Sequence, residues 1–357
     1  MFDYDVAVIG LGPAGSTFAR LAAVDMKVFA LSRPVGEGGF SKPCGGLLSS
    51  DAQKALSRFD LTLPKDILVD PQIFSVRTID LKSGLIRHYQ RFYINLDRDR
   101  FDSWMASLIP NSADIVRGVC RSIKRLENGG FEIAYTDSEG EKRITARFVV
   151  GADGANSAVR KNLFPQKKFR SYISIQQWFD EKNDSPFYSC IFDPETSDSC
   201  SWSISKDGKF IFGGAFAPEN CREMFELQKQ KLSEKFGFKF GVPVKTEACM
   251  VLRPKTPSDF CTGADGAFLI GEAAGFISPS SFEGVSWAIN SARLLAQAIK
   301  NPNPNKNYHK LTRTIRLKLL LKRLKCPFMY HPLLRRWVMK SGMQTIEVTP
   351  TQRRPLE

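Results

Sequence analysis

The chain has 357 residues, of which 43% are hydrophobic and 25% charged, the composition of a folded protein large enough for two or more packed units. Its apolar runs are too short for a transmembrane helix, and the acidic first residues, Met1–Tyr4, do not resemble a signal peptide. Eight cysteines without C-x-x-C spacing and only three histidines argue against structural zinc and a disulfide framework. We therefore expect free thiols, no metal site and a cytoplasmic location.

The positive charge is concentrated near the end of the chain. The formal net charge is +14, and residues 284–346 contain thirteen Lys or Arg and no Asp or Glu. The first 283 residues therefore carry only about +1. Basic segments attract phosphate-bearing partners such as nucleic acid, anionic lipid or a phosphorylated substrate. The sequence has no nucleic-acid recognition motif, so nucleic acid is the disfavoured partner.

The apolar residues of this basic segment follow two helical stripes rather than one face. The first stripe is Leu311, Ile315 and Leu319, and the second is Leu317, Leu320, Leu321 and Leu324. We expect the segment to pack against the body of the protein while its long basic side chains reach an anionic membrane surface. The protein would then be peripheral at the inner face of the membrane. A merely solvated pair of basic helices is the alternative.

The first thirty residues have the pattern of a nucleotide-binding βαβ unit. A buried strand, a G-x-G-x-x-G turn, a helix and a second strand follow one another. Gly10 permits the tight turn, Gly12 lets the backbone approach a pyrophosphate at the helix N-terminus, and Gly15 allows the helix to pack closely on the strand. The other cofactor-binding candidates in the turn are Pro13 and Ala14. A glycine-rich turn without a ligand is the alternative to a dinucleotide site.

The acid that usually ends the second strand of such a unit is missing. A carboxylate at this position commonly binds the adenosine ribose. Here the position is Ser32, followed by Arg33. We expect Ser32 to make a single hydrogen bond and Arg33 to lie near phosphate or adenine, so the departure affects ribose recognition more than pyrophosphate binding.

Three later segments complete the pattern. A strand over 147–150 leads into a turn with Asp153–Gly154, and an apolar strand over 267–270 leads into Gly271–Glu272–Ala273–Ala274–Gly275. Arg98 stands in Leu96–Asp97–Arg98, before a helix. With these segments in this order, the chain resembles the FAD-dependent family that shares the fold of para-hydroxybenzoate hydroxylase.

This resemblance implies roles for the residues of these segments. Asp153 and Gly154 look like the family's D-G motif, and Glu272 with Gly275 looks like its G-D motif, with Glu in place of the usual Asp. Arg98 would meet FAD phosphate or the flavin. A helix starting at Gly284–Val285 would direct its positive end at the flavin and stabilise the reduced ring. The alternatives are a turn-capping role for Asp153 and a solvated loop acid for Glu272.

The resemblance also implies an architecture. The fold would be α/β: a doubly wound Rossmann-like FAD-binding domain with an interleaved β-sheet substrate domain and a helical C-terminal segment. The FAD-binding domain would comprise residues 1–70, 96–165 and 253–300. The substrate domain would comprise 71–95 and 166–252, and the basic helical segment 301–357.

A glycine-rich loop narrows the resemblance. The segment Gly36–Leu48 lets backbone approach something flat or anionic closely. Its Lys42–Pro43–Cys44–Gly45–Gly46 resembles the K-x-C-G-G element of geranylgeranyl reductases, which implies that Cys44, Gly45 and Gly46 lie at the flavin beside the substrate. Cys44 would be a proton donor, a redox-active thiol or a shaping residue; a packed buried thiol is the alternative. The order of motifs over the whole chain resembles that of the bacterial CbrA-like flavoproteins.

The middle of the chain is β-rich and aromatic. Strands are predicted at 173–179, 187–192, 199–205 and 209–216, a hairpin turn at Lys206–Gly208 and a helix at 219–236; the resemblance adds strands at 72–80 and 85–94. An apolar ligand beside a flavin needs an aromatic wall. The candidate pocket residues are Trp178, Tyr188, Trp202 and Phe212. The alternative is that this aromatic face is core.

These observations favour an FAD-dependent oxidoreductase that reduces a carbon–carbon double bond of a prenyl (geranylgeranyl-type) lipid. An FAD-dependent monooxygenase acting on an aromatic or polyketide ring is the second hypothesis, and a flavin halogenase, with Lys42 as its lysine, is the third. A membrane-associated flavin-bearing binding protein is the non-enzymatic alternative. No second G-x-G-x-x-G occurs, so NAD(P)H would act as a transient electron donor, or another reductant would serve.

Overall fold

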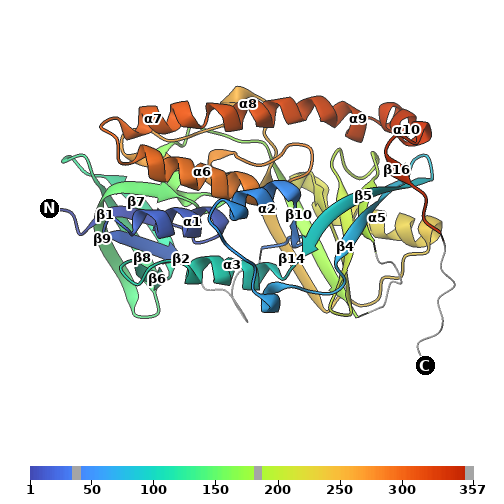
Figure 1. The fold of residues 1–357 in the computed structure, drawn as a ribbon, viewed down its shortest axis with the longest axis horizontal. Helices are drawn as coiled ribbons and strands as arrows, with labels where there is room; N and C mark the ends of the chain where they lie inside the picture. Colours follow the sequence, from blue (N-terminus) through green and yellow to red (C-terminus); the bar gives the residue numbers. More distant parts are fainter. Residues whose placement is uncertain (34–41, 181–186, 350–357) are drawn as a thin grey trace.

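The structure, a computed structural model, describes residues 1–33, 42–180 and 187–349. Two β-sheets lie side by side along the long axis, and a layer of helices runs across one long side (Figure 1). The chain passes between the sheets repeatedly, because each sheet takes strands from separated parts of the sequence. The predicted α/β class, with a doubly wound nucleotide-binding unit and an interleaved second sheet, is confirmed.

The first sheet has seven strands in the order β6-β2-β1-β9-β8-β7, with β15 also paired to β9. Its strands are β1 (Tyr4–Ile9), β2 (Val28–Ser32), β6 (Asp114–Arg117), β7 (Val119–Arg125), β8 (Phe131–Asp137), β9 (Gly140–Gly151) and β15 (Ala267–Leu269). Ile9 pairs in parallel with Leu31 on one side and Gly151 on the other, so three strands end together. Ligands of open α/β sheets bind at this edge. Strands β6–β8 were not predicted.

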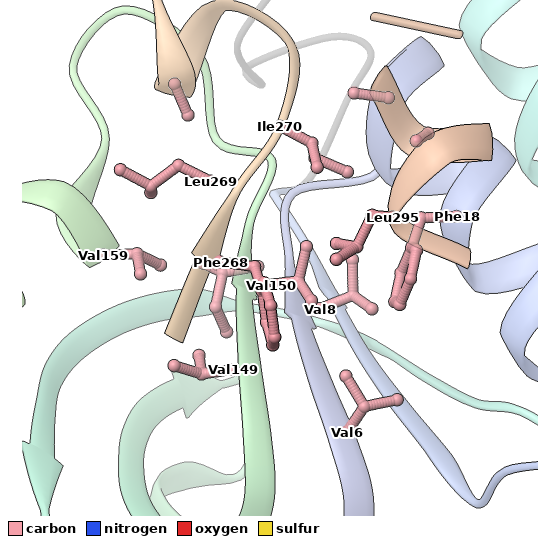
Figure 2. Packing of buried hydrophobic residues seen from close by; sticks show 14 of the residues in the cluster. Val6, Val8, Phe18, Val149, Val150, Val159, Phe268, Leu269, Ile270 and Leu295 are labelled. Carbon is pink, nitrogen blue, oxygen red and sulfur yellow. The ribbon is translucent and has the colours of Figure 1, made fainter. Parts of the chain in front are cut away.

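Helices α1 (Pro13–Ala22) and α6 (Val285–Ala298) pack against this sheet and against each other. Phe18 of α1 and Leu295 of α6 lie next to Val8 of β1 (Figure 2), and all three are fully buried. Strands buried on both faces carry continuous apolar runs, as 149–150 and 267–270 do. The remaining helices near this sheet are α2 (Ser50–Ser57), α3 (Arg98–Ser107) and α4 (Ala158–Leu163).

The second sheet has nine strands in the order β14-β10-β13-β12-β11-β4-β5-β16, with β3 also paired to β5. Its strands are β3 (Leu47–Leu48), β4 (Ile73–Asp80), β5 (Leu85–Asn95), β10 (Ser171–Phe179), β11 (Tyr188–Phe192), β12 (Ser201–Lys206), β13 (Lys209–Phe216), β14 (Lys245–Leu252) and β16 (Thr345–Ile346). The predicted hairpin is confirmed: Asp207 and Gly208 both have positive φ, as a type I′ turn requires. Helix α5 (Cys221–Phe236) packs on one face over Phe212.

The C-terminal segment forms four helices along one long side of the molecule (Figure 1). They are α7 (Pro304–Leu311), α8 (Arg313–Lys322), α9 (Cys326–Tyr330) and α10 (Pro332–Ser341); 3-10 turns lie at Lys65–Ile67, Pro218–Asn220, Pro257–Asp259, Gly271–Ala274 and Arg323–Lys325. Helix α7 packs against α6, and α9 and α10 lie at the end that carries β5 and β16. Ile315 and Leu319 are buried in the main core, so the segment packs on the body as expected. Within the described ranges, none of the helices is long and apolar enough to cross a bilayer.

Candidate FAD and substrate site

A single continuous cavity of about 1750 Å³ connects the two sheets. It starts at the β1–α1 turn, passes the segment around Cys44 and ends against α9 and α10. Sites for one drug-sized ligand are commonly about 300–1,000 Å³. The cavity therefore has room for a dinucleotide and a second ligand placed end to end.

The β1–α1 turn has an open cradle in front of a helix N-terminus. A Cβ built on Gly12 meets no other atom within 4 Å, whereas one on Gly15 would lie 1.8 Å from the Gly10 carbonyl oxygen. Gly12 lines the cavity and is the N-cap of α1. The first backbone hydrogen bond of the helix runs from Ser16 N–H to the Gly12 carbonyl oxygen. The N–H groups of Ala14 and Gly15, at the first turn, have no acceptor within the helix and are available to bind an anion. Gly15 serves packing, and Gly12 leaves space for a ligand.

Asp153 offers a second polar contact on the same edge of the sheet. One carboxylate oxygen, Oδ2, accepts hydrogen bonds from Ala158 N (2.6 Å) and Val159 N (3.3 Å) at the start of α4. The other, Oδ1, is buried and has no hydrogen-bond partner among the described residues. Burial raises the pKa of Asp153. A ribose or ribityl hydroxyl would satisfy Oδ1, so Asp153 combines the predicted capping role with a free acceptor, and the residues present fit FAD.

Other predicted dinucleotide contacts lie along the same part of the cavity. Ser32, Arg33 and Gly154 line it, as do Gly284 and Val285 at the start of α6. Helix α6 begins where the sequence predicted. Ahead of it, however, the Glu283 carboxylate already accepts a hydrogen bond from Ser286 N at 2.7 Å. Burial raises the pKa of Glu283. A carboxylate at this position offsets part of the positive potential of the helix N-terminus.

The predicted G-D-like motif makes contacts within the protein. Glu272 lines the cavity, but its Oε2 lies 2.6 Å from Lys42 Nζ and its Oε1 accepts a hydrogen bond from Leu252 N at 2.9 Å. Burial lowers the pKa of Lys42, but the charge of Glu272, the nearby Cys249 and the hydrogen bond to Glu272 together outweigh burial, so the pKa is raised. Gly275 does not line the cavity; a Cβ there would lie 2.2 Å from the Asp259 carbonyl oxygen. Gly275 is therefore placed as a packing residue rather than a cofactor contact.

The Cys44 segment lies at the middle of the cavity. Cys44 Sγ accepts a hydrogen bond from Gly46 N (3.4 Å) and lies 3.7 Å from Arg98 Nη1. Arg98 is in turn held by both oxygens of Asp102, at 2.8 and 3.0 Å. The predicted residues Cys44, Gly45, Gly46 and Arg98 are thus brought together at the cavity wall. The glycine-rich residues 36–41 of the same loop lie outside the described residues.

A buried lysine supports this segment from behind. Lys206 is 5% exposed, and its Nζ donates hydrogen bonds to the carbonyl oxygens of Leu96 and Gly46. No carboxylate among the described residues pairs with it. Burial lowers the pKa of Lys206 to about 8. Lys206 therefore ties the Cys44 segment to the strand that precedes Arg98.

Two of the four predicted pocket aromatics line the cavity. The Trp202 ring lies against Gly213, since a Cβ built there would meet the ring at 2.7 Å. A Cβ built on Gly45 would lie 3.6 Å from Trp202 Cδ1, so the edge of the ring faces Gly45. Tyr188 lines the cavity and packs edge-on against Tyr93 at 5.9 Å. Beyond them the chamber is mostly apolar. Its wall includes Val76, Phe192, Phe328, Met329, Val338, Met339 and Met343.

The other two predicted aromatics are placed elsewhere. Phe212 is fully buried on the opposite face of the sheet, in the core under α5, 5.2 Å from the Phe225 ring. Trp178 packs with Ile204 and Ile211, and its Nε1 donates to Glu247 at 2.9 Å. Neither lines the cavity.

The sequence reasoning missed four cavity thiols, Cys120, Cys190, Cys200 and Cys249. Cys249 lies near the Lys42–Glu272 pair, and burial raises its pKa to about 11. Cys190 lies on β11, and its Sγ is 3.9 Å from Tyr188 Oη. Its position two residues after Tyr188 is the signal that could have identified it, because alternate residues of a strand share a face.

The fold and the site are those of a flavoprotein. A family model described as an FAD binding domain matches residues 126–303. A solved structure of a geranylgeranyl bacteriochlorophyll reductase-like protein from Thermoplasma acidophilum matches with a TM-score of 0.79 and 21% identity, covering 94% of this chain and 90% of that one. PqsL of Pseudomonas aeruginosa matches with a TM-score of 0.70 and 14% identity, covering 95% and 98%. Together with the pyrophosphate cradle, the match to the FAD binding domain defines an FAD-dependent oxidoreductase.

Comparison with curated protein sequences identifies the family. Over 351 residues the chain is 51% identical to Protein CbrA of Escherichia coli O139:H28, which covers 97% of this chain and 99% of that protein. Protein CbrA of Shigella flexneri is also 51% identical, covering 97% and 95%. The chain belongs to the CbrA family.

Proposed function

We propose that the protein reduces carbon–carbon double bonds of a prenyl lipid in an FAD-dependent reaction. One observation carries the proposal: the cavity joins a pyrophosphate cradle at Gly12 to an apolar chamber, with Cys44 and Trp202 where the two parts meet. An apolar chain needs such a chamber beside the redox centre. The bound flavin would supply hydride to one alkene carbon.

The chain's own residues would position the alkene and supply the proton. Cys44 Sγ accepts hydrogen bonds from Gly46 N–H and Arg98 Nη1, which hold the sulfur at the cavity wall. Its S–H would donate a proton to the second alkene carbon. The Trp202 ring, packed between Gly45 and Gly213, forms a flat wall beside that thiol. The apolar chamber beyond excludes water from the reacting carbons. The resemblance of the Cys44 segment to geranylgeranyl reductases supports the same assignment.

The electron donor is part of the proposal. Only one G-x-G-x-x-G occurs in the chain, and its cradle is assigned to FAD. NAD(P)H or another reductant would therefore act as a transient donor rather than occupy a domain of its own.

Single-turnover kinetics test this function. Flavin-loaded protein, reduced without oxygen, should be reoxidised by a geranylgeranyl lipid, and each reduced double bond should add two hydrogens to the product mass. Cys44→Ser should slow this step by ~100- to 10,000-fold, the usual contribution of a general acid. Cys120→Ser is the matched control, since Cys120 lines the same cavity at the dinucleotide end, near Asp153.

Two outcomes would contradict the proposal. Reoxidation by oxygen alone, with oxygen consumed in step with hydroxylation of an added aromatic compound, would identify a monooxygenase. An unchanged rate in Cys44→Ser would remove the thiol from the reaction and leave it a packing role.

A further inference from the structure

The C-terminal helices expose an unusual amount of apolar surface. Ten of the twenty exposed large apolar side chains in the described parts of the chain lie between residues 311 and 348. Trp337 is 81% exposed, Leu333 69% and Leu324 68%. Such concentration marks an interaction surface, because single exposed apolar residues are ordinarily scattered.

Four of these side chains form one stripe. Helix α8, the 3-10 turn at Arg323–Lys325 and α9 follow one another with helical backbone throughout. Leu317, Leu321, Leu324 and Phe328 are spaced by four, three and four residues along this run. At 3.6 residues per turn they fall within about 60° of one another. At the same end of the molecule, α10 adds Leu333 and Trp337, one helical turn apart (Figure 1).

Basic side chains flank the apolar ones. Lys318, Lys325, Arg336 and Lys340 are exposed, and none of them makes an ion pair with another described residue. No acidic residue occurs between 284 and 346. An apolar stripe bordered by long basic side chains is typical of a helix that lies in the interface of an anionic bilayer, with Trp at headgroup depth. We call Leu317, Leu321, Leu324, Phe328, Leu333, Trp337 and Met343 the C-terminal face.

Two residues of the C-terminal face, Phe328 and Met343, also border the chamber, whereas Leu324, Leu333 and Trp337 do not line it. Phe328 and Met343 line the cavity, yet they are 53% and 65% exposed, so they lie at its rim. Arg335, in the middle of α10, is 3% exposed and fixes this helix to the sheet through Asp80 at 3.0 Å. The chamber therefore reaches the surface beside the exposed stripe.

From this arrangement we infer that the C-terminal face seats the protein on an anionic phospholipid bilayer, with the cavity rim turned to the membrane so that an apolar ligand enters directly from the lipid phase. The docking follows from the surface alone; that the entering ligand is an alkene chain rests on the proposed function.

Vesicle binding of the full-length, flavin-loaded protein tests the docking. It should sediment with phosphatidylcholine vesicles containing phosphatidylglycerol, more weakly at high salt, and its tryptophan fluorescence should shift to the blue. Lys318→Ser/Lys325→Ser/Arg336→Ser/Lys340→Ser should lower partitioning at least tenfold, since each basic group contributes up to about fivefold. Leu324→Ser/Leu333→Ser/Trp337→Ser should do the same. Val242→Ser/Val244→Ser is the control, because these two valines are also apolar and exposed but lie far in sequence from the C-terminal face.

The outcomes separate the inference from the proposed function. No sedimentation of the wild type, or equal loss in the control and the two variant sets, would overturn the docking. If both sets lose binding, turnover of a prenyl lipid in vesicles should fall at least tenfold while turnover of the same lipid in detergent is unchanged. Binding lost in these variants with no prenyl lipid reduced in either form would support the docking and refute the proposed function.

Discussion

Substitutions at Gly12 should change the affinity for FAD without lowering the stability of the flavin-free protein. Gly12 has φ −72° and ψ −171°, a conformation open to any residue, and a Cβ there meets no other atom within 4 Å. Gly12→Ala should therefore keep or raise the stability of the flavin-free protein, by up to about 1 kcal/mol. The larger Gly12→Val side chain would occupy the cradle and hold a pyrophosphate away from Ala14 and Gly15 N–H. Hydrogen bonds to charged groups are worth about 1.5–3 kcal/mol each, so losing two weakens FAD binding by ~100- to 10,000-fold.

Two measurements on each variant check this reasoning. Urea unfolding of the flavin-free protein reports stability, and quenching of flavin fluorescence reports the Kd for FAD. Gly15→Ala is the contrasting control: its Cβ would lie 1.8 Å from the Gly10 carbonyl oxygen, so the fold itself should be destabilised. A Gly12→Val protein that binds FAD with unchanged affinity, or that unfolds as readily as Gly15→Ala, would refute the cradle.

Three further variants probe the supports of the site. The folded-state pKa of Lys206, about 8, lies below its ordinary value of 10.5, so the unfolded chain binds more protons between these pH values and stability rises with pH there. The free energy of unfolding of the wild type relative to Lys206→Met should therefore increase by about 3 kcal/mol from pH 7 to pH 10.5. A difference in urea titrations that does not change with pH would contradict the burial of Lys206. Asp80→Ala leaves Arg335 buried and unpaired and should cost about 3–5 kcal/mol, part of which Arg335→Met in the same chain should recover; a double variant as unstable as the single one would count against the pair. Phe212→Ala should lower the free energy of unfolding by about 3–5 kcal/mol, measured by thermal or urea unfolding, without changing substrate KM. A changed KM at unchanged stability would show instead that Phe212 contacts the substrate.

Local sequence signals predicted the cofactor end of the site well. The β1–α1 turn, the start of α6 at Val285 and the hairpin at Asp207–Gly208 each depend on a few neighbouring residues whose backbone requirements are specific. Pairs that lie far apart in the chain carried no such signal. The Lys42–Glu272 ion pair joins residues 230 positions apart, and nothing around either residue indicates its partner.

The positions of the aromatic side chains could be predicted only in part from the sequence. The two-residue turn fixes the register of β12 and β13, in which Trp202 pairs with Gly213 and Phe212 with Ser203. Side chains that are directly opposite share a face, and successive residues alternate, so Trp202 and Phe212 had to lie on opposite faces. The hairpin therefore showed that Trp202 and Phe212 could not both line one pocket, although it did not show which of the two faces borders the cavity.

The interleaving of the two sheets has a consequence for synthesis of the chain. The first sheet needs β15, which ends at Leu269, and the second needs β14 and β16, which end at Leu252 and Ile346. Neither sheet is complete until well over half of the polypeptide has left the ribosome, so the two halves cannot fold one after the other as independent units. Early strands such as β4 and β5 must wait with unpaired edges, which makes the nascent chain dependent on protection from aggregation. For the same reason, fragments cut at the domain boundaries would each lack strands of their own sheet.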